Sequence, residues 1–276
     1  MRRQRKIHRI LAALVLIPGA LVILFPFYWM LTASLEHISQ LVQFPPQLIP
    51  HPLDFSSYPR GLTFLPFGRY FFNTAQIAVL STLGAVMSAS LVGFAFARLH
   101  SPTKVFFFTL LLSTMMLPAS VLLIPQFVLF KSIGWVNTYL PLIVPAYFGG
   151  SAFLIFLFRQ FFAGIPEEVF DAARMDGCGN LGLYWRMARP LAVPAFTAAT
   201  VFHFQFSWND FLAPLIYINS NSKYTIALGL AGFSSQYGST PWNQLMAVSL
   251  LMALVPILIF FFAQDYLING IVVASR

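Results

Sequence analysis

The chain has few charged residues. Asp, Glu, Lys and Arg together make up 9% of its 276 residues, whereas hydrophobic residues make up 58%. A water-soluble domain of this length would cover its surface with charge, and this chain cannot do so. A charge in the hydrocarbon core of a bilayer costs about 2.5 to 3.5 kcal/mol on the insertion scale, so a lipid-facing surface must be poor in charge. The sequence therefore predicts a membrane protein.

The motifs of several enzyme and metal sites are also missing. The single cysteine, Cys178, excludes an internal disulfide, and the five histidines form no paired Cys/His spacing. No Gly-Lys dipeptide occurs, so the chain has no GxxxxGK[ST] phosphate loop. We expect no cofactor and no metal in this chain, and no ATP hydrolysis by the chain alone.

The chain does contain long apolar segments. A helix needs about 20 apolar residues to cross the hydrocarbon core, and six nearly charge-free windows approach that length: 10–31, 72–97, 105–124, 139–158, 191–212 and 243–262. The alternating pattern of membrane barrel strands is missing, so helices must satisfy the backbone in lipid. We predict an all-α membrane protein with six transmembrane helices in one domain, 1–276, with an N-terminal helix over 10–31 and core helices within 72–262.

Lys and Arg lie mainly on one side of this predicted bundle. If both termini are cytoplasmic, the inner segments carry 12 of the 16 Lys and Arg residues, and the outer segments carry Arg60, Arg69, Lys131 and Lys223. This split follows the positive-inside rule, so the net charge of +8 indicates orientation and not nucleic-acid binding. The basic start resembles a signal peptide, but its apolar run exceeds the usual length of about 7 to 15 residues. We expect a multi-pass protein with both termini in the cytoplasm.

Two other classes of membrane protein share parts of this pattern. Ser151 after Gly149 and Gly150 in the fourth span resembles the nucleophile of rhomboid proteases, which need a histidine on the sixth helix. The sixth span has none, so the glycines are predicted to serve close helix packing. A secondary transporter usually holds ionisable residues near mid-membrane, whereas Asp210 is the only carboxylate within the predicted spans. Neither class is favoured.

Four of the eight carboxylates lie in one stretch, IPEEVFDAARMDGCGN, between the fourth and fifth spans. Pro166 and the two glutamates after it suit the first turn of a helix, and Gly177 suits the position just beyond its end. One side of this helix is predicted to carry Val169, Ala172, Ala173 and Asp176, with Phe170 and Met175 extending the apolar surface. Such a short amphipathic helix could lie on lipid headgroups or dock into a groove of another protein.

The same stretch resembles a motif of a known family. DAARMDG followed by WRMARPLAVPA resembles the EAA loop of ABC importer membrane subunits, with Asp171 in place of the usual Glu and Arg189 in place of the usual Leu. The carbohydrate-type subfamily is resembled, in the same order along essentially the whole chain, by FPFYWMLTASL, FPPQLIP, RYFFNTAQIAVLSTLGAVMSASLVGFAFARL, LIPQFVLFKSIGWVNTYLPLIVP, FSWNDFLAPLIYI and QDYLINGI.

This resemblance implies a type I ABC importer permease in a bacterial or archaeal inner membrane. Residues 163–190 would be a coupling segment that contacts an ATPase subunit through Glu168, Asp171, Ala172, Ala173, Asp176, Gly177 and Pro190. The implied partners are a second homologous permease, two ATPase subunits that bind ATP and Mg²⁺, and an extracytoplasmic solute-binding protein. The implied solute is a carbohydrate, with glycerol phosphate or a glycosylated polyol as alternatives.

The outer half of the fifth span mixes polar and aromatic side chains. Amide and carboxylate groups bind sugar hydroxyls, and aromatic rings cover the C–H faces of a sugar. The residues predicted to line the solute pathway are His203, Gln205, Trp208, Asn209 and Asp210. The same mixture also arises from ordinary helix packing. No Lys or Arg lies within the six spans, which favours a neutral carbohydrate over a phosphate ester.

Overall fold

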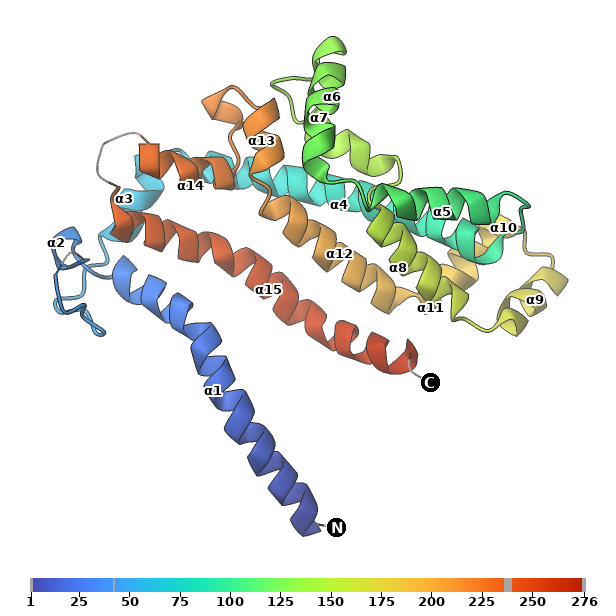
Figure 1. Cartoon of the computed structure of the whole chain (residues 1–276), viewed down its shortest axis with the longest axis horizontal. Coiled ribbons are helices and arrows are strands. Elements are labelled where there is room, and N and C mark those ends of the chain that lie inside the picture. The colour runs from blue at the N-terminus through green and yellow to red at the C-terminus, as the bar shows by residue number, and fades with distance from the viewer. Residues whose placement is uncertain (1, 42, 236–239, 275–276) are drawn as a thin grey trace. The chain divides into compact units, whose positions relative to one another are not determined.

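The computed structural model describes residues 2–41, 43–235 and 240–274. Helices follow one another along the chain (Figure 1), and no strand occurs among these described residues. The chain forms two compact units. One comprises Met1–Phe67 and Gly229–Val255, and the other comprises Gly68–Leu228 and Pro256–Arg276.

The first unit is held together by aromatic and small residues. Its elements are α1 (Arg2–Ser34), α2 (Ile38–Leu41), α3 (Ser57–Phe64), and parts of α14 (Ile226–Ser235) and α15 (Trp242–Ala274). The ring of Phe233 stacks on Phe64 with centroids 4.7 Å apart. Gly61 of α3 faces α15, where an added Cβ would lie 2.8 Å from Cγ2 of Val248. A small residue is therefore needed where these two helices meet.

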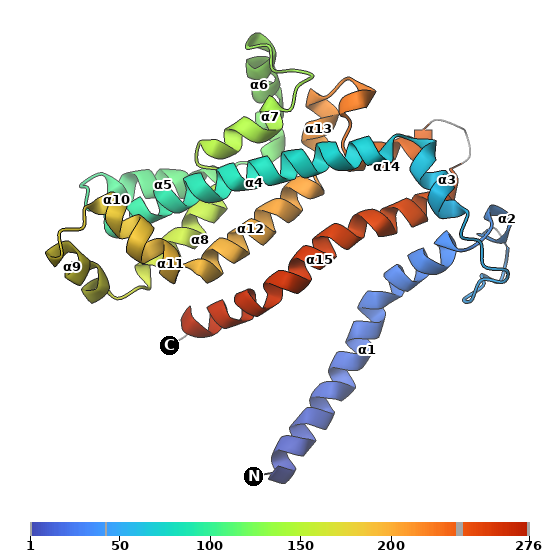
Figure 2. The same ribbon diagram turned by 180° about the vertical axis from the view of Figure 1, so that it is seen from behind.

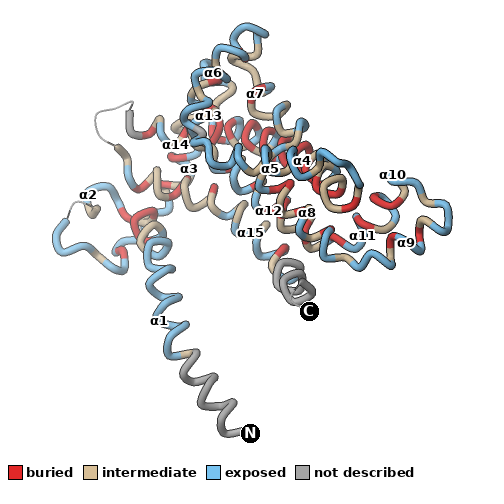
Figure 3. The backbone as a smooth tube through the Cα atoms, turned by 45° about the vertical axis from the view of Figure 1, so that its right-hand side comes forward, coloured by how far each residue is buried: buried red, intermediate tan, exposed pale blue. Residues whose placement is uncertain are grey.

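Most described residues of α1 are exposed (Figure 3), and most of these are apolar. The segment Ala13–Ser34 is apolar enough to cross a membrane, yet none of its most apolar window is buried inside the structure. Val15 and Val22, for example, are 73% and 74% exposed. An apolar surface of this size needs lipid or another protein chain to cover it.

The second unit is built around the long helix α4 (Phe67–Arg98) (Figures 1 and 2). Helix α8 (Ala152–Ala163) packs against α5 (Lys104–Thr114) and α12 (Val193–Trp208). Ala85, Ala89 and Gly93 recur every four residues on α4, so they lie on one face. A Cβ on Gly93 would lie 2.6 Å from Cβ of Phe158, which shows how closely α4 and α8 approach each other.

Three predicted spans are not single long helices. Within the described residues, four segments are long and apolar enough to cross a membrane: Ala13–Ser34, Phe67–Arg98, Leu140–Ala163 and Trp242–Asp265. The predicted span 105–124 divides into α5 and α6 (Ala119–Ser132), because Pro118 lacks a backbone N–H and disfavours helix in the residue before it. The predicted span 191–212 yields α12, which ends at Trp208 and is followed after a short break by α13 (Leu212–Tyr217).

The predicted span 139–158 is interrupted by two glycines. It forms α7 (Leu140–Ile143), the 3₁₀ turn η1 (Val144–Tyr147) and α8, with Gly149 and Gly150 at φ angles of 103° and 62° in between. An added Cβ on Gly150 would lie 2.8 Å from Cα of Ala85 on α4. The predicted role in close packing is confirmed for Gly150, and the left-handed backbone there also favours glycine.

A polar cluster joins the loop after α6 to the segment that precedes the turn η3 (Asn221–Lys223). Asn137 has a φ of 62°, a left-handed conformation that asparagine tolerates. Its side-chain oxygen accepts hydrogen bonds from the backbone N–H groups of Asn219 and Ser220 at 3.2 and 3.0 Å. Its amide donates to Oγ of Ser220 at 2.8 Å, so this one residue holds two distant loops together.

Candidate functional site

The charged stretch of the coupling segment forms α9 (Glu167–Met175), as predicted. Pro166 is the residue before the helix and not its first residue, and Glu167 and Glu168 occupy the first turn. Gly177 has a φ of 82° and donates its N–H to the carbonyl of Arg174 at 2.9 Å, while Cys178 donates to the carbonyl of Ala173 at 2.9 Å. These two bonds form a Schellman motif, so the predicted helix stop at Gly177 is confirmed.

The buried face of α9 differs from the predicted one. Phe170 is fully buried and Ala173 is 6% exposed, whereas Ala172 and Asp176 are exposed. The buried face is narrower than predicted, because Phe170 and Ala173 of the predicted apolar surface are buried, Val169 is half-buried, and the other members are exposed. The exposed face of α9 carries Glu168, Asp171, Ala172 and Met175.

Two aromatic residues cover the underside of α9. The ring of Phe170 lies 6.2 Å from that of Phe94 on α4, measured between centroids. The ring of Tyr184 lies 5.5 Å from the same Phe94, and its hydroxyl lies 2.7 Å from Oγ of Ser90. All four side chains are buried. Their packing fixes α9 against the end of α4.

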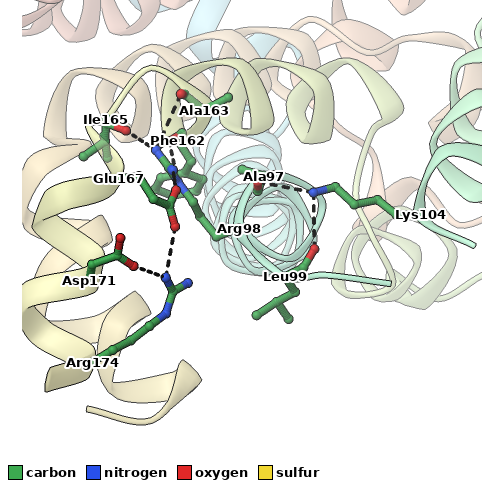
Figure 4. Close-up of polar contacts among 10 residues, drawn as sticks. All are labelled: Ala97, Arg98, Leu99, Lys104, Phe162, Ala163, Ile165, Glu167, Asp171 and Arg174. Carbon is green, nitrogen blue, oxygen red and sulfur yellow. Dashed lines mark hydrogen bonds and ion pairs between the residues drawn. The ribbon is translucent and has the colours of Figure 1, made fainter. Parts of the chain in front are cut away.

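Arg98, the last residue of α4, ties the end of this helix to the start of the coupling segment (Figure 4). It is 7% exposed, and its Nε and Nη2 donate to the carbonyl of Phe162 at 3.1 and 2.6 Å. Further bonds run from the guanidinium to the carbonyl of Ile165 and to the carboxylate of Glu167. The guanidinium also lies 4.4 Å above the centre of the Phe170 ring. Sequence reasoning missed this role, because Arg98 enters it only as one of the 12 Lys and Arg residues of the inner segments.

A second arginine pairs with the carboxylates of α9. Arg174 donates to Glu167 at 3.0 Å and to Asp171 at 2.7 Å. The hydrogen bond from Arg174, together with the charge of Arg98, lowers the pKa of Glu167 below its usual value. Glu167 therefore stays ionised at neutral pH and links both arginines.

The rest of the coupling segment leads into α12. It contains α10 (Asn180–Gly182), the π-helix η2 (Leu183–Ala188) and α11 (Arg189–Leu191), where Pro190 is exposed. The two departures from the family motif both have partners within the chain. Asp171 pairs with Arg174, and the guanidinium of Arg189 lies 5.0 Å above the ring of Trp185.

A cavity of about 450 Å³ lies beside the C-terminal half of α12, and it divides the predicted pathway residues. His203 and Asp210 line it, whereas Gln205, Trp208 and Asn209 do not belong to the described lining. Trp208 is instead 4% exposed, with its ring 5.6 Å from that of Phe71. Asn209 bonds to the carbonyl of Gln205 at 2.8 Å at the end of α12.

Polar residues of other helices also line this cavity. Ser81 of α4 donates to Ser207 of α12 at 3.0 Å, and Gln126 of α6 also lines the cavity. His203 lies 3.3 Å from the hydroxyl of Thr82. Sequence reasoning missed Ser81 and Gln126 because it considered the fifth span alone. Both are polar residues in otherwise apolar segments, and this pattern could have indicated a polar cavity.

Comparison with known proteins identifies similar chains. A model of the family described as "Binding-protein-dependent transport system inner membrane component" matches residues 89–273. The chain is 33% identical over 279 residues to the arabinooligosaccharides transport system permease protein AraQ of Bacillus subtilis, covering 99% of this chain and 97% of AraQ. It is 32% identical over 269 residues to the sn-glycerol-3-phosphate transport system permease protein UgpE of Yersinia enterocolitica, covering 95% of each.

A solved structure shares the fold. A chain of a bacterial ABC transporter involved in the import of the acidic polysaccharide alginate matches with a TM-score of 0.80 and 22% identity. The match covers 96% of this chain and 98% of the other. This likeness confirms the predicted all-α permease fold.

Proposed function

Because the chain belongs to the inner membrane components of binding-protein-dependent transport systems, we propose that it forms half of the translocation pathway of an ATP-driven carbohydrate importer. It is a transport permease subunit and not an enzyme, as its sequence predicted. The observation that carries the proposal is the environment of α9. This short helix is held to the end of α4 by Arg98, and its opposite face is exposed.

The exposed face of α9 is the proposed contact with a partner ATPase. Asp171 and Met175 are 62% and 88% exposed, whereas Phe170 and Ala173 are buried by packing within the chain. Asp176 and Gly177 shape the helix end, and Pro190 lies at the entry into α12. ATP and Mg²⁺ would be bound by that ATPase, and its closure would push α9.

The exposed apolar residues of α1 and the distribution of Lys and Arg support further parts of the proposal. The exposed apolar side chains of α1 suit lipid and a second, homologous permease. The complex would comprise two permeases, two ATPase subunits and an extracytoplasmic binding protein. The distribution of Lys and Arg supports a cytoplasmic location for both termini, on the same side as α9.

The proposed solute is a neutral carbohydrate. Ser81, His203, Ser207 and Asp210 offer the cavity hydroxyl, imidazole and carboxylate groups that can bind sugar hydroxyls. Among the described residues that line this cavity, none is Lys or Arg. Glycerol phosphate, the solute in the name of UgpE, would bring a phosphate close to Asp210 with no cation there to offset the repulsion.

The test is reconstitution of the whole complex in vesicles with its own binding protein. Uptake of a neutral oligosaccharide and of glycerol phosphate is measured in the presence and absence of ATP. We expect ATP-dependent oligosaccharide uptake, no glycerol phosphate uptake, and no ATP hydrolysis by this chain alone. Preferential uptake of glycerol phosphate would contradict the proposed solute, and uptake by the lone chain would contradict the proposed importer.

A further inference from the structure

Arg98 belongs to α4, yet its side chain serves another part of the chain. All polar contacts of its guanidinium in the described structure lie within residues 162–167, and its face covers the ring of Phe170. The accepting carbonyls of Phe162 and Ala163 lie in the last turn of α8, where the regular helical N–H partners end. One buried cation thus joins the end of α4, the end of α8 and the start of α9.

Lys104 provides a contrast at the same end of α4. Its ammonium group donates to the carbonyls of Ala97 and Leu99 at 3.3 and 3.2 Å. Figure 4 shows both cations, with Arg98 directed toward the coupling segment and Lys104 directed toward the last turn of α4 itself. Both side chains donate hydrogen bonds to backbone carbonyl groups, but of the two only Arg98 connects α4 to α9.

We propose that Arg98 is a positioning residue that transmits the movement of α9 to α4. This inference rests on the proposed contact between α9 and an ATPase. Ser81, on the same helix as Arg98, lines the solute cavity about 25 Å away along the axis, at 1.5 Å per residue. Because α4 is a continuous helix between these two residues, a displacement at Arg98 is carried to the cavity wall.

The chemistry of this contact requires a guanidinium group. A planar fork of N–H donors reaches several carbonyl oxygens and the Glu167 carboxylate at once, and its flat face stacks on Phe170. An ammonium group at the end of a lysine is a point charge without such a face. Glutamine keeps a hydrogen-bond donor but has no charge to pair with Glu167.

The experiment measures how many solute molecules the reconstituted complex imports per ATP hydrolysed. The variants are Arg98→Gln and Arg98→Lys, and Lys104→Gln is the matched control. We expect the ratio to fall about tenfold or more in Arg98→Gln and to be intermediate in Arg98→Lys, where one charged group remains. Lys104→Gln should keep the ratio of the original chain, because it lacks any described contact with α9.

Two outcomes would overturn the inference. If Arg98→Gln lowers the amount of assembled complex but the remaining complex imports at the original ratio, Arg98 only stabilises packing. If the complex with Arg98→Gln does not assemble, the Arg98→Lys complex is measured instead, and an original ratio in that complex overturns the inference as well.

Cross-linking of Met175→Cys to the ATPase, in a chain that keeps Arg98, separates this inference from the proposed function. Failure to cross-link contradicts the proposed function, whereas cross-linking with unchanged ratios contradicts the role of Arg98 alone.

Discussion

The hydroxyl oxygens of Ser90 and Tyr184 lie 2.7 Å apart and join α4 to the π-helix that follows α9. Ser90 also donates to the carbonyl of Met87 at 2.9 Å, so its single proton is already used. Tyr184 must therefore donate to Ser90. Both residues are 1% exposed or less, so bulk solvent does not reach either hydroxyl.

This direction of donation makes the two single substitutions unequal. Ser90→Ala strands the buried hydroxyl of Tyr184 and should lower the free energy of unfolding by about 1–3 kcal/mol. Tyr184→Phe leaves Ser90 bonded to Met87 and should cost about 0.5–1.5 kcal/mol. The double variant should cost less than the sum of the two. Thermal unfolding of the purified permease in detergent measures all three, and strictly additive costs would contradict the bond.

Gly177→Val should disturb the end of α9 without disturbing membrane insertion. An added Cβ meets nothing within 4 Å, so the cost comes only from the left-handed backbone at φ 82°, at least about 1 kcal/mol for a residue with a Cβ. We expect normal permease levels in the membrane, less ATPase in the purified complex and little uptake.

Gly177→Asn is the matched control for this variant. Asparagine tolerates a left-handed conformation, so the Asn variant should retain most of its ATPase and most of its uptake. Quantifying the co-purified ATPase for both variants separates backbone strain from loss of the glycine itself. Equal losses in the two variants would contradict the role given to the Schellman turn.

The link between Glu167 and the two arginines should weaken only in acid. Its pKa in the folded chain lies below the ordinary value of 4.5, mainly because Arg174 donates a hydrogen bond to it. A lowered carboxylate pKa stabilises the fold above pH 4.5, and this contribution is lost as the pH falls through the lowered value. The difference in melting temperature between the original chain and Glu167→Gln should be constant from pH 7 to about pH 5 and shrink below pH 4.5. A difference that grows on acidification would contradict this assignment.

Cys178 reports the side of the membrane on which α9 lies. It is the only cysteine, and it is half-buried just after Gly177. A membrane-impermeant thiol reagent should label it in inside-out vesicles and leave it unlabelled in intact cells. The reverse pattern would invert the proposed topology.

Local chemistry made part of this structure predictable. The start of α9 follows from Pro166 and the two glutamates, and its end follows from Gly177, because these signals act within one or two turns. The continuous apolar runs of α4 and α15 likewise gave long helices. These features depend on residues that are close in the chain.

Features that depend on distant residues escaped prediction. Phe170 is buried because Phe94, 76 positions earlier, lies beneath it, so the pattern of α9 alone does not show which of its apolar residues are covered. Arg98 mainly contacts backbone carbonyls more than 60 residues away, and backbone atoms carry no sequence signal. The break at Gly149 and Gly150 was read only as a packing site, because an apolar run does not reveal backbone angles.

Site-specific cross-linking tests the coupling role of α9 most directly. A single cysteine is placed at Met175, which is 88% exposed, in a Cys178→Ser chain within the reconstituted complex. Met116→Cys, at a methionine 84% exposed in the turn between α5 and α6, is the matched control. We expect a thiol-to-amine cross-linker to join Met175→Cys to the ATPase, and Met116→Cys to give no such product. An active complex in which Met175→Cys reacts only with lipid-soluble reagents and never with the ATPase would make α9 an ordinary interfacial helix.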